Sequence, residues 1–158
     1  MVTAIKGNAT STFGGNIDVP QIITDAPAFS AYINVVQTLS AATWTKMQFN
    51  AEHFDTNSNY DTSTYRFTPT VAGYYQFNFG FKIASSQTRM ILDLYKNGSS
   101  TRQASDMNSA TYGMDMSALI YMNGTTDYIE AYGYGGTGGN TLADARYSYF
   151  DGYLARAV

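Results

Sequence analysis

The most regular part of this sequence is Tyr60-Asp61-Thr62-Ser63-Thr64-Tyr65-Arg66-Phe67-Thr68-Pro69-Thr70-Val71-Ala72-Gly73-Tyr74-Tyr75-Gln76-Phe77-Asn78-Phe79-Gly80-Phe81. From Tyr75 to Ile83 every second residue is aromatic or aliphatic, which predicts a strand with one face in a core. A helix would scatter the same rings around its axis. Pro69 cannot donate to a sheet ladder, so we expect a short strand to end there and a long strand to begin at Gly73.

The spacing of this stretch also resembles a known family. The matching positions are Tyr60-Asp61, Thr64, Phe67, Gly73, Tyr75 and Phe77. They resemble the globular head domain of complement component one-q, which shares its jelly-roll fold with the tumour necrosis factor ligands. Further matches follow in the same order along the chain: Ala28-Phe29-Ser30-Ala31, Leu94-Tyr95-Lys96-Asn97-Gly98, and Phe150, Gly152 and Leu154. Tyr65 and Pro69 stand where many animal members have Gly and Cys, so this chain is more similar to the microbial and viral members.

The resemblance implies an all-β fold, a two-sheet antiparallel jelly-roll sandwich of about ten strands that forms trimers. We expect the head domain to span residues 28–158. Residues 1–27 are rich in Gly, Thr, Asn and Ser, which indicates an N-terminal arm, either a flexible leader or the end of a stalk.

Local patterns place several elements within this frame. Asn97-Gly98 after an apolar run predicts a tight hairpin. The alternation of residues 44–49 predicts a strand, with Phe49 and Phe54 as core anchors. Residues 114–122 alternate without a clean polar face, which fits a strand buried on both sides or a central strand with a mixed outer face. The Gly-rich residues 135–140 are typical of a mobile loop.

Composition excludes several classes of partner. The formal net charge is −3 and only 13% of residues are charged, which argues against a nucleic-acid partner. There is no cysteine for a disulfide and no apolar run long enough to insert into a membrane. Residues 1–16 lack the pattern of a secretory signal. A surface of Thr, Ser, Asn and Gly suits a protein held in an assembly or one that meets neutral sugars.

No motif predicts an enzyme. The only histidine is His53, and a lone histidine without cysteine cannot form a zinc site. The two glutamates, Glu52 and Glu130, give no positive sign of a glycosidase pair. We expect neither catalytic residues nor a cofactor. Because some members of the resembled family hold calcium, Asp55, Asp115 and Asp127 are named as candidate calcium ligands, although no motif matches them.

We expect the chain to be its own principal partner, as a homotrimer. Apolar side chains in excess of what one sandwich can cover favour such an assembly. The candidate trimer-interface residues are Tyr74, Met114, Met116, Tyr147, Tyr149 and Tyr153.

The favoured function is a head domain of a virion or phage tail-fibre structural protein, located on the virion surface, that binds a glycan or protein receptor on the host cell. Exposed tyrosines stack on sugar rings, so the candidate ligand-binding residues are Tyr112, Tyr128, Tyr132 and Tyr134, which flank the Gly-rich segment. Two alternatives stay open. One is a secreted recognition or signalling protein of the complement one-q or tumour necrosis factor type. The other is a structural cap that only trimerises a fibre.

Overall fold

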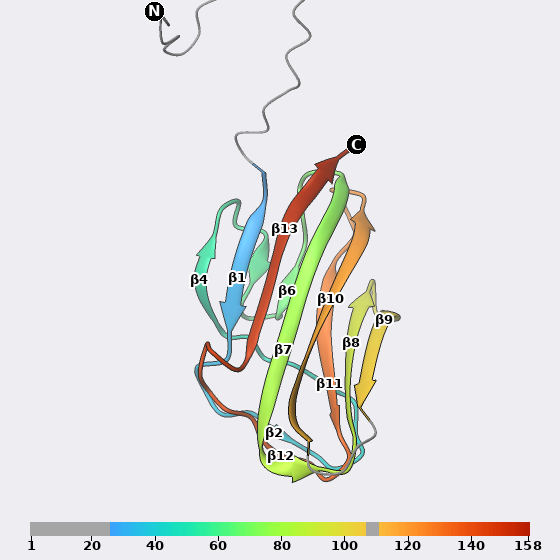
Figure 1. The fold of residues 1–158 in the computed structure, drawn as a ribbon. Helices are drawn as coiled ribbons and strands as arrows, with labels where there is room; N and C mark the ends of the chain where they lie inside the picture. Colours follow the sequence, from blue (N-terminus) through green and yellow to red (C-terminus); the bar gives the residue numbers. More distant parts are fainter. Residues whose placement is uncertain (1–25, 107–110) are drawn as a thin grey trace, which may run out of the picture.

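Two antiparallel sheets form the molecule. The computed structural model describes residues 26–106 and 111–158. The five-stranded sheet has the order β10-β7-β13-β1-β4, and the six-stranded sheet has the order β5-β6-β11-β8-β9 with β3 paired to β11. Figure 1 shows the two sheets packed face to face, with β7 running the length of the molecule. This arrangement confirms the predicted two-sheet jelly-roll sandwich.

The strands of the five-stranded sheet are β1 (Ala28–Tyr32), β4 (Ala51–Asp55), β7 (Gly73–Gln87), β10 (Thr111–Met122) and β13 (Tyr149–Ala157). Those of the six-stranded sheet are β3 (Thr45–Lys46), β5 (Tyr60–Asp61), β6 (Arg66–Phe67), β8 (Met90–Lys96), β9 (Ser99–Asp106) and β11 (Ile129–Gly135). Two further short strands, β2 (Thr38–Leu39) and β12 (Gly139–Asn140), pair with each other. No part of residues 26–106 and 111–158 is helical, so the described chain has no helix that could cross a membrane.

The core lies between the sheets and is built from rings. The odd residues of β7 from Tyr75 to Ile83 are all buried, as their alternation predicts. Phe29 stacks on Phe67 with ring centroids 4.4 Å apart and meets Phe150 edge-on at 5.0 Å. Such ring pairs add to the free energy gained by burying apolar area. The core thus fixes which side of each strand faces solvent.

The hairpin between β8 and β9 forms as expected. Asn97 and Gly98 have φ values of 53° and 78°, the left-handed conformations that a two-residue hairpin turn requires. Pairing then runs from Lys96 opposite Ser99 to Met90 opposite Asp106. The hairpin therefore places β8 between β9 and β11 in the six-stranded sheet.

Three local expectations are wrong. Phe54 is 51% exposed and lies on the outer side of β4, because it pairs with Ser30, whose neighbours Phe29 and Ala31 face the core. Strand β10 is an edge strand and not a central one; Leu119 on it is exposed in the single chain, and burial of its outer side by a partner subunit remains a prediction. The Gly-rich segment is tied into the fold, because Gln87 Nε2 donates to the carbonyl oxygen of Gly138 over 2.9 Å.

The predicted domain boundary falls mostly outside the described residues. Of the predicted arm, residues 1–27, only the last two belong to the described part, where the Leu154 amide donates to the Pro27 carbonyl over 2.9 Å. The division into arm and head remains a prediction.

Candidate ligand-binding face

The solvent side of the six-stranded sheet carries the candidate site. On β11 the residues Ile129, Ala131 and Gly133 point to the core, so by alternation Glu130, Tyr132 and Tyr134 take the opposite side. On β8 their direct neighbours across the ladder are Tyr95, Asp93 and Ile91, in that order. Two neighbouring strands therefore present rings and carboxylates together on one face.

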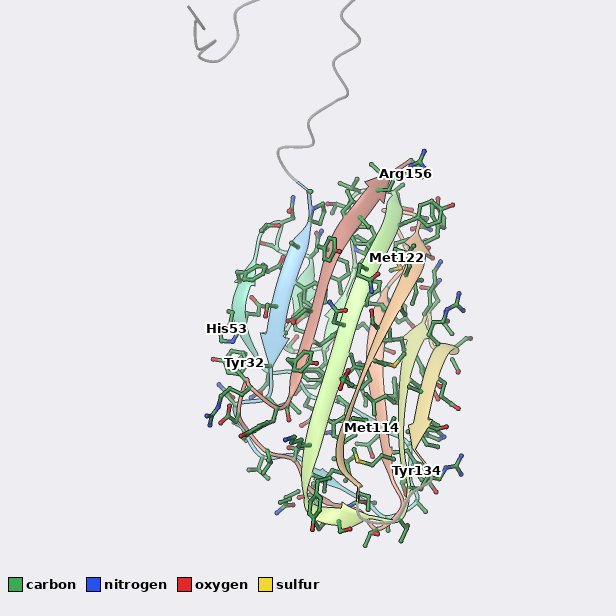
Figure 2. The ribbon with its side chains drawn as sticks, viewed as in Figure 1. Tyr32, His53, Met114, Met122, Tyr134 and Arg156 are labelled. Carbon is green, nitrogen blue, oxygen red and sulfur yellow. The ribbon has the colours of Figure 1, made fainter. Side chains whose placement is uncertain are left out.

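Four aromatic side chains meet on this face and are called the outer aromatic cluster: Trp44, Tyr95, Tyr132 and Tyr134. Tyr95 and Tyr132 are stacked with their centroids 4.1 Å apart. The Trp44 ring lies 5.6 Å from that of Tyr134 and 6.4 Å from that of Tyr95, and Trp44 is 38% exposed. Figure 2 shows Tyr134 at the end of the sandwich opposite Arg156. The rings thus form a continuous, partly exposed apolar surface.

An ion triad borders the cluster. Glu130 is 2% exposed, and its Oε1 atom accepts from Lys46 Nζ over 2.6 Å and from Arg66 Nε over 2.5 Å. Burial alone would raise the pKa of Glu130, but the hydrogen bonds from the two cations outweigh burial and hold the pKa below its usual range. The Arg66 guanidinium also lies 4.2 Å from the Tyr128 ring centroid. These ion pairs hold the side chains of Lys46 and Arg66 in place beside Tyr132.

A second carboxylate lies within the face. Asp93 is 1% exposed, and its Oδ2 atom accepts from Ser100 Oγ over 2.6 Å and from Gln103 Nε2 over 3.2 Å. Its Oδ1 atom is buried without a hydrogen-bond partner. A buried polar atom of this kind costs free energy unless something satisfies it.

The structure brings together three of the four predicted ligand-binding tyrosines. Tyr132 and Tyr134 lie on β11, and Tyr128 directly precedes that strand. Tyr112 lies on β10 in the other sheet and is exposed, but no ring contact joins it to the others within the described residues. Whether any of the four binds a ligand remains a prediction.

Sequence reasoning missed Trp44, Tyr95 and Asp93. The alternation of residues 44–49 did place Trp44 and Lys46 on the same side of a strand, which the pairing of β3 with β11 bears out. What it could not show is that this strand lies beside β11, about ninety residues later in the chain.

The candidate trimer-interface residues divide between the two sides of the five-stranded sheet. Tyr74, Tyr149 and Tyr153 lie on its outer side, where Tyr74 and Tyr153 are exposed. Leu119 and Tyr121 extend that side across β10, and the rings of Tyr74 and Tyr121 lie 5.6 Å apart. We call this exposed surface the assembly face; its members are Phe54, Tyr74, Leu119, Tyr121 and Tyr153.

Met114 and Met116 do not belong to the assembly face. They pair with Phe81 and Phe79 and share their orientation toward the core, where Met116 is buried and Met114 packs against the buried cluster. The alternation of β10 therefore turns these two residues toward the core of the single chain, and their place in a trimer interface remains a prediction.

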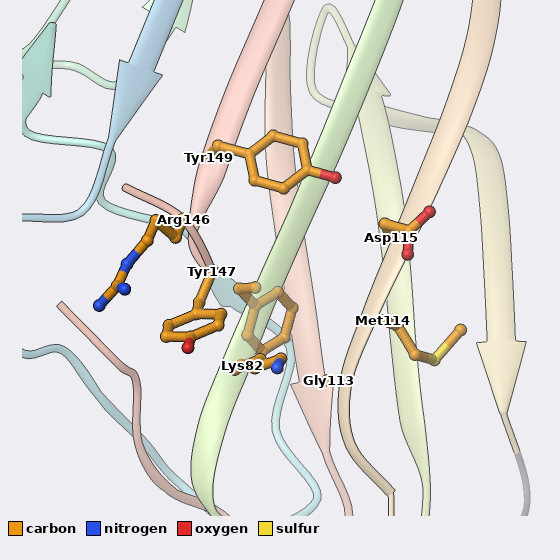
Figure 3. Close-up of a pocket in the computed structure, with 8 residues that line it drawn as sticks. Lys82, Gly113, Met114, Asp115, Arg146, Tyr147 and Tyr149 are labelled. Atoms are coloured by element: carbon orange, nitrogen blue, oxygen red, sulfur yellow. The ribbon is translucent and has the colours of Figure 1, made fainter. Parts of the chain in front are cut away.

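Tyr147 lies at one end of the five-stranded sheet, beside a cavity of about 300 Å³. Its ring stands 4.3 Å from Lys82 Nζ and 5.3 Å from the Arg146 guanidinium. Figure 3 shows Tyr147 between these two cations, with Tyr149 farther along the same segment and Asp115 on β10. Arg146 is itself paired with Asp144 over 2.6 Å, and this pairing lowers the pKa of Asp144 to about 2.

The candidate calcium ligands lie in separate places. Asp55 and Asp115 are on β4 and β10, the opposite edges of the five-stranded sheet, and Asp127 is paired with Lys96 over 2.8 Å. Across the described residues, no three His, Asp or Glu side chains are close enough together to hold a metal ion. The geometry thus gives these aspartates no shared site.

Comparison with known proteins identifies the family to which this chain belongs. The sequence pattern described as C1q domain matches residues 28–155. The chain belongs to the C1q domain family. Domains of this family and of the related tumour necrosis factor fold are non-catalytic and typically form homotrimers. A search of the curated proteins finds no relative of this chain.

Solved structures share the C1q-type fold at low identity. The globular domain of zebrafish complement 1qA is 22% identical, with a TM-score of 0.62, over 84% of this chain and 99% of that one. Eiger TNF from S. frugiperda is 9% identical, with a TM-score of 0.68, over 85% and 95%. PRD1 vertex protein P5 is 17% identical, with a TM-score of 0.61, over 84% and 98%. These likenesses concern the fold alone.

Proposed function

We propose that this C1q domain is the trimeric head of a virion or tail-fibre structural protein and binds a glycan on the host cell surface through the outer aromatic cluster. The observation that carries the binding role is the cluster itself, four rings in contact on the solvent side of a sheet with Trp44 partly exposed. Rings placed in this way offer flat apolar surface to a sugar, and the polar groups beside them offer hydrogen bonds.

Two observations support the location on a virion. Tyr65 and Pro69 depart from the animal members toward the microbial and viral ones. The PRD1 vertex protein shows that a protein of a phage particle has this fold. A secreted recognition protein of the animal type remains the alternative, and its ligand would be a protein receptor.

The two faces suit different roles in such a head. The exposed apolar side chains of the assembly face are typical of an interaction surface, and two further copies of the chain would bury them in a trimer. The outer aromatic cluster lies on the other sheet and stays free in that arrangement. The head would then present three binding faces, and avidity would strengthen binding to a cell surface.

The test uses fluorescently labelled protein on a glycan array and on a panel of bacteria. We expect binding that falls at least tenfold in Trp44→Ala and in Tyr132→Ala, since each change removes a stacking ring. Val35→Ala, at an exposed apolar residue between β1 and β2 that belongs to neither candidate surface, is the control and should bind like the native protein. Binding to neither glycans nor bacteria by an intact trimer would instead support a structural cap.

A further inference from the structure

Two buried polar atoms without a hydrogen-bond partner lie on β8 or directly before it, beside the proposed binding face. The described part of the chain has four such side-chain atoms, and two of them, Arg89 Nε and Asp93 Oδ1, belong to the same side of β8 and its first flanking residue. Between them on that side lies Ile91, which is buried. One atom is a hydrogen-bond donor and the other an acceptor, so together they could satisfy a ligand that carries both kinds of group.

The position of Asp93 relates it to the outer aromatic cluster. Asp93 pairs with Tyr132 in the ladder. The two neighbouring pairs on the same side of the sheet are Tyr134 with Ile91 and Glu130 with Tyr95. Trp44 contacts both Tyr134 and Tyr95, the two rings on either side of the paired residues Asp93 and Tyr132. Asp93 is only 1% exposed although it lies on the solvent side of the sheet, with Ser100 and Gln103 of β9 bonded to its other oxygen.

Few contacts restrain the Trp44 side chain in the described part of the chain. Within residues 26–106 and 111–158 its side chain is held by tilted ring contacts and by no hydrogen bond. The backbone just before it contains Ala42 in the left-handed region, with φ of 52°, in a run of exposed residues. The Trp44 side chain is therefore the least restrained of the four rings beside Asp93.

We propose that Asp93 is the polar anchor of the glycan site: its free oxygen accepts a hydrogen bond from a pyranose hydroxyl that enters when Trp44 swings aside and stacks on the sugar. Sugar hydroxyls both donate and accept, and a buried carboxylate is a strong acceptor for them. Four residues along a strand span about 13 Å, so a ligand that also reaches Arg89 is longer than one sugar ring. The ligand class is therefore an oligosaccharide of at least two pyranose units that lies along β8. This inference rests on the proposed glycan-binding function.

The experiment exploits the fact that Trp44 is the only tryptophan in the chain. The folded protein is titrated with glucose, galactose and mannose and with the disaccharides lactose and maltose, while its tryptophan fluorescence is followed. At least one disaccharide should change the emission and bind more tightly than the monosaccharides. Asp93→Asn should weaken that binding about tenfold, because the charge-assisted hydrogen bond is lost. Arg89→Gln should remove the advantage of the disaccharide.

The control is Asp151→Asn, which removes the other buried carboxylate oxygen without a partner, on the five-stranded sheet. It should leave sugar binding unchanged. Asp93→Asn should melt at the native temperature or above it, since the amide keeps the shape of the side chain and no carboxylate oxygen without a partner remains at this position. Native affinity in Asp93→Asn, with Trp44→Ala still impaired, would overturn the anchor role and leave the proposed function standing. A native protein that binds no sugar on the array or in solution would overturn both.

Discussion

At the scale of single residues, the most informative positions are those where the backbone conformation or the surrounding space restricts which side chain fits. Tyr65 has φ of 56°, a left-handed conformation, at a position where many family members have glycine. A side chain with a Cβ atom costs about 1 kcal/mol or more there. Gly152 shows the opposite case, because a Cβ atom at this position would lie 2.6 Å from the Phe29 ring. The family's glycines thus mark two different constraints, conformation and space.

The strain at Tyr65 predicts a difference between two variants. Tyr65→Gly and Tyr65→Ala both remove the ring, but only glycine removes the cost of the left-handed backbone. We expect Tyr65→Gly to be more stable than Tyr65→Ala by about 1 kcal/mol in the free energy of unfolding. Urea unfolding of the two variants measures this difference. Equal stability would show that the turn carries no strain at this residue.

Asp151 predicts a dependence of stability on pH. It lies on the outer side of β13, opposite Ser30 on β1 and Asn78 on β7. Burial raises its pKa, against the smaller effects of Ser30 and His53, whose ring stacks on Tyr32 at the β1–β4 edge (Figure 2). The folded protein therefore disfavours the ionised form. Asp151 lowers the free energy of unfolding as the pH rises from its unfolded pKa through its higher folded pKa.

Asp151→Asn should therefore be more stable than the native protein at pH 7, by about 1 kcal/mol. The advantage should disappear below about pH 4, where the native carboxylate is protonated in both states. Unfolding curves of both proteins across this range provide the measurement. A constant advantage at every pH would mean that the carboxylate does not titrate as described.

At the scale of elements, Glu130 ties three strands together. It lies on β11 and binds Lys46 on β3 and Arg66 on β6, two strands of only two residues each. Strands this short have few ladder hydrogen bonds to hold their register. The buried ion triad therefore contributes to fixing both of them beside the outer aromatic cluster.

Glu130→Gln should lower the free energy of unfolding by about 2 kcal/mol at pH 7, because it leaves two partly buried cations without their partner. The depressed pKa of Glu130 means that its contribution is present above the unfolded pKa and is lost as the pH falls. Lys46→Gln and Arg66→Gln should each cost less, since one cation remains. Thermal melts of the three variants at pH 7 and at acidic pH would show whether this order holds.

Elements also show how far a sequence can predict this structure. The face of β7 and the Asn97-Gly98 turn are local properties, so their patterns sufficed. Phe54 was misplaced because its side is set by pairing with Ser30 of β1, a non-local contact that a sequence pattern does not reveal. Of the outer aromatic cluster, the sequence predicted two of the four rings as candidate binding residues, Tyr132 and Tyr134. Tyr132 and Tyr134 share a strand, whereas the pairing that brings Trp44 to them is non-local.

At the scale of the whole molecule, the two sheets present two surfaces with different chemistry. The outer side of the five-stranded sheet combines apolar side chains with the Asp151 carboxylate, and a cavity of about 320 Å³ lies there between Tyr74, Leu119 and Arg156. The outer side of the six-stranded sheet combines rings with the ion triad. If the first surface assembles the trimer and the second binds a glycan, the two activities are separable by mutation.

Leu119→Lys and Trp44→Lys test that separation, because both side chains are exposed in the single chain and neither change needs to disturb the core. The native protein should scatter light as a homotrimer at micromolar concentration. Leu119→Lys should shift it to a folded monomer, since the change buries an unpaired charge in the interface. Trp44→Lys should remain a trimer and lose glycan binding. A stable native monomer would contradict the assembly role of this face, and so would a trimer that survives both Leu119→Lys and Tyr153→Lys.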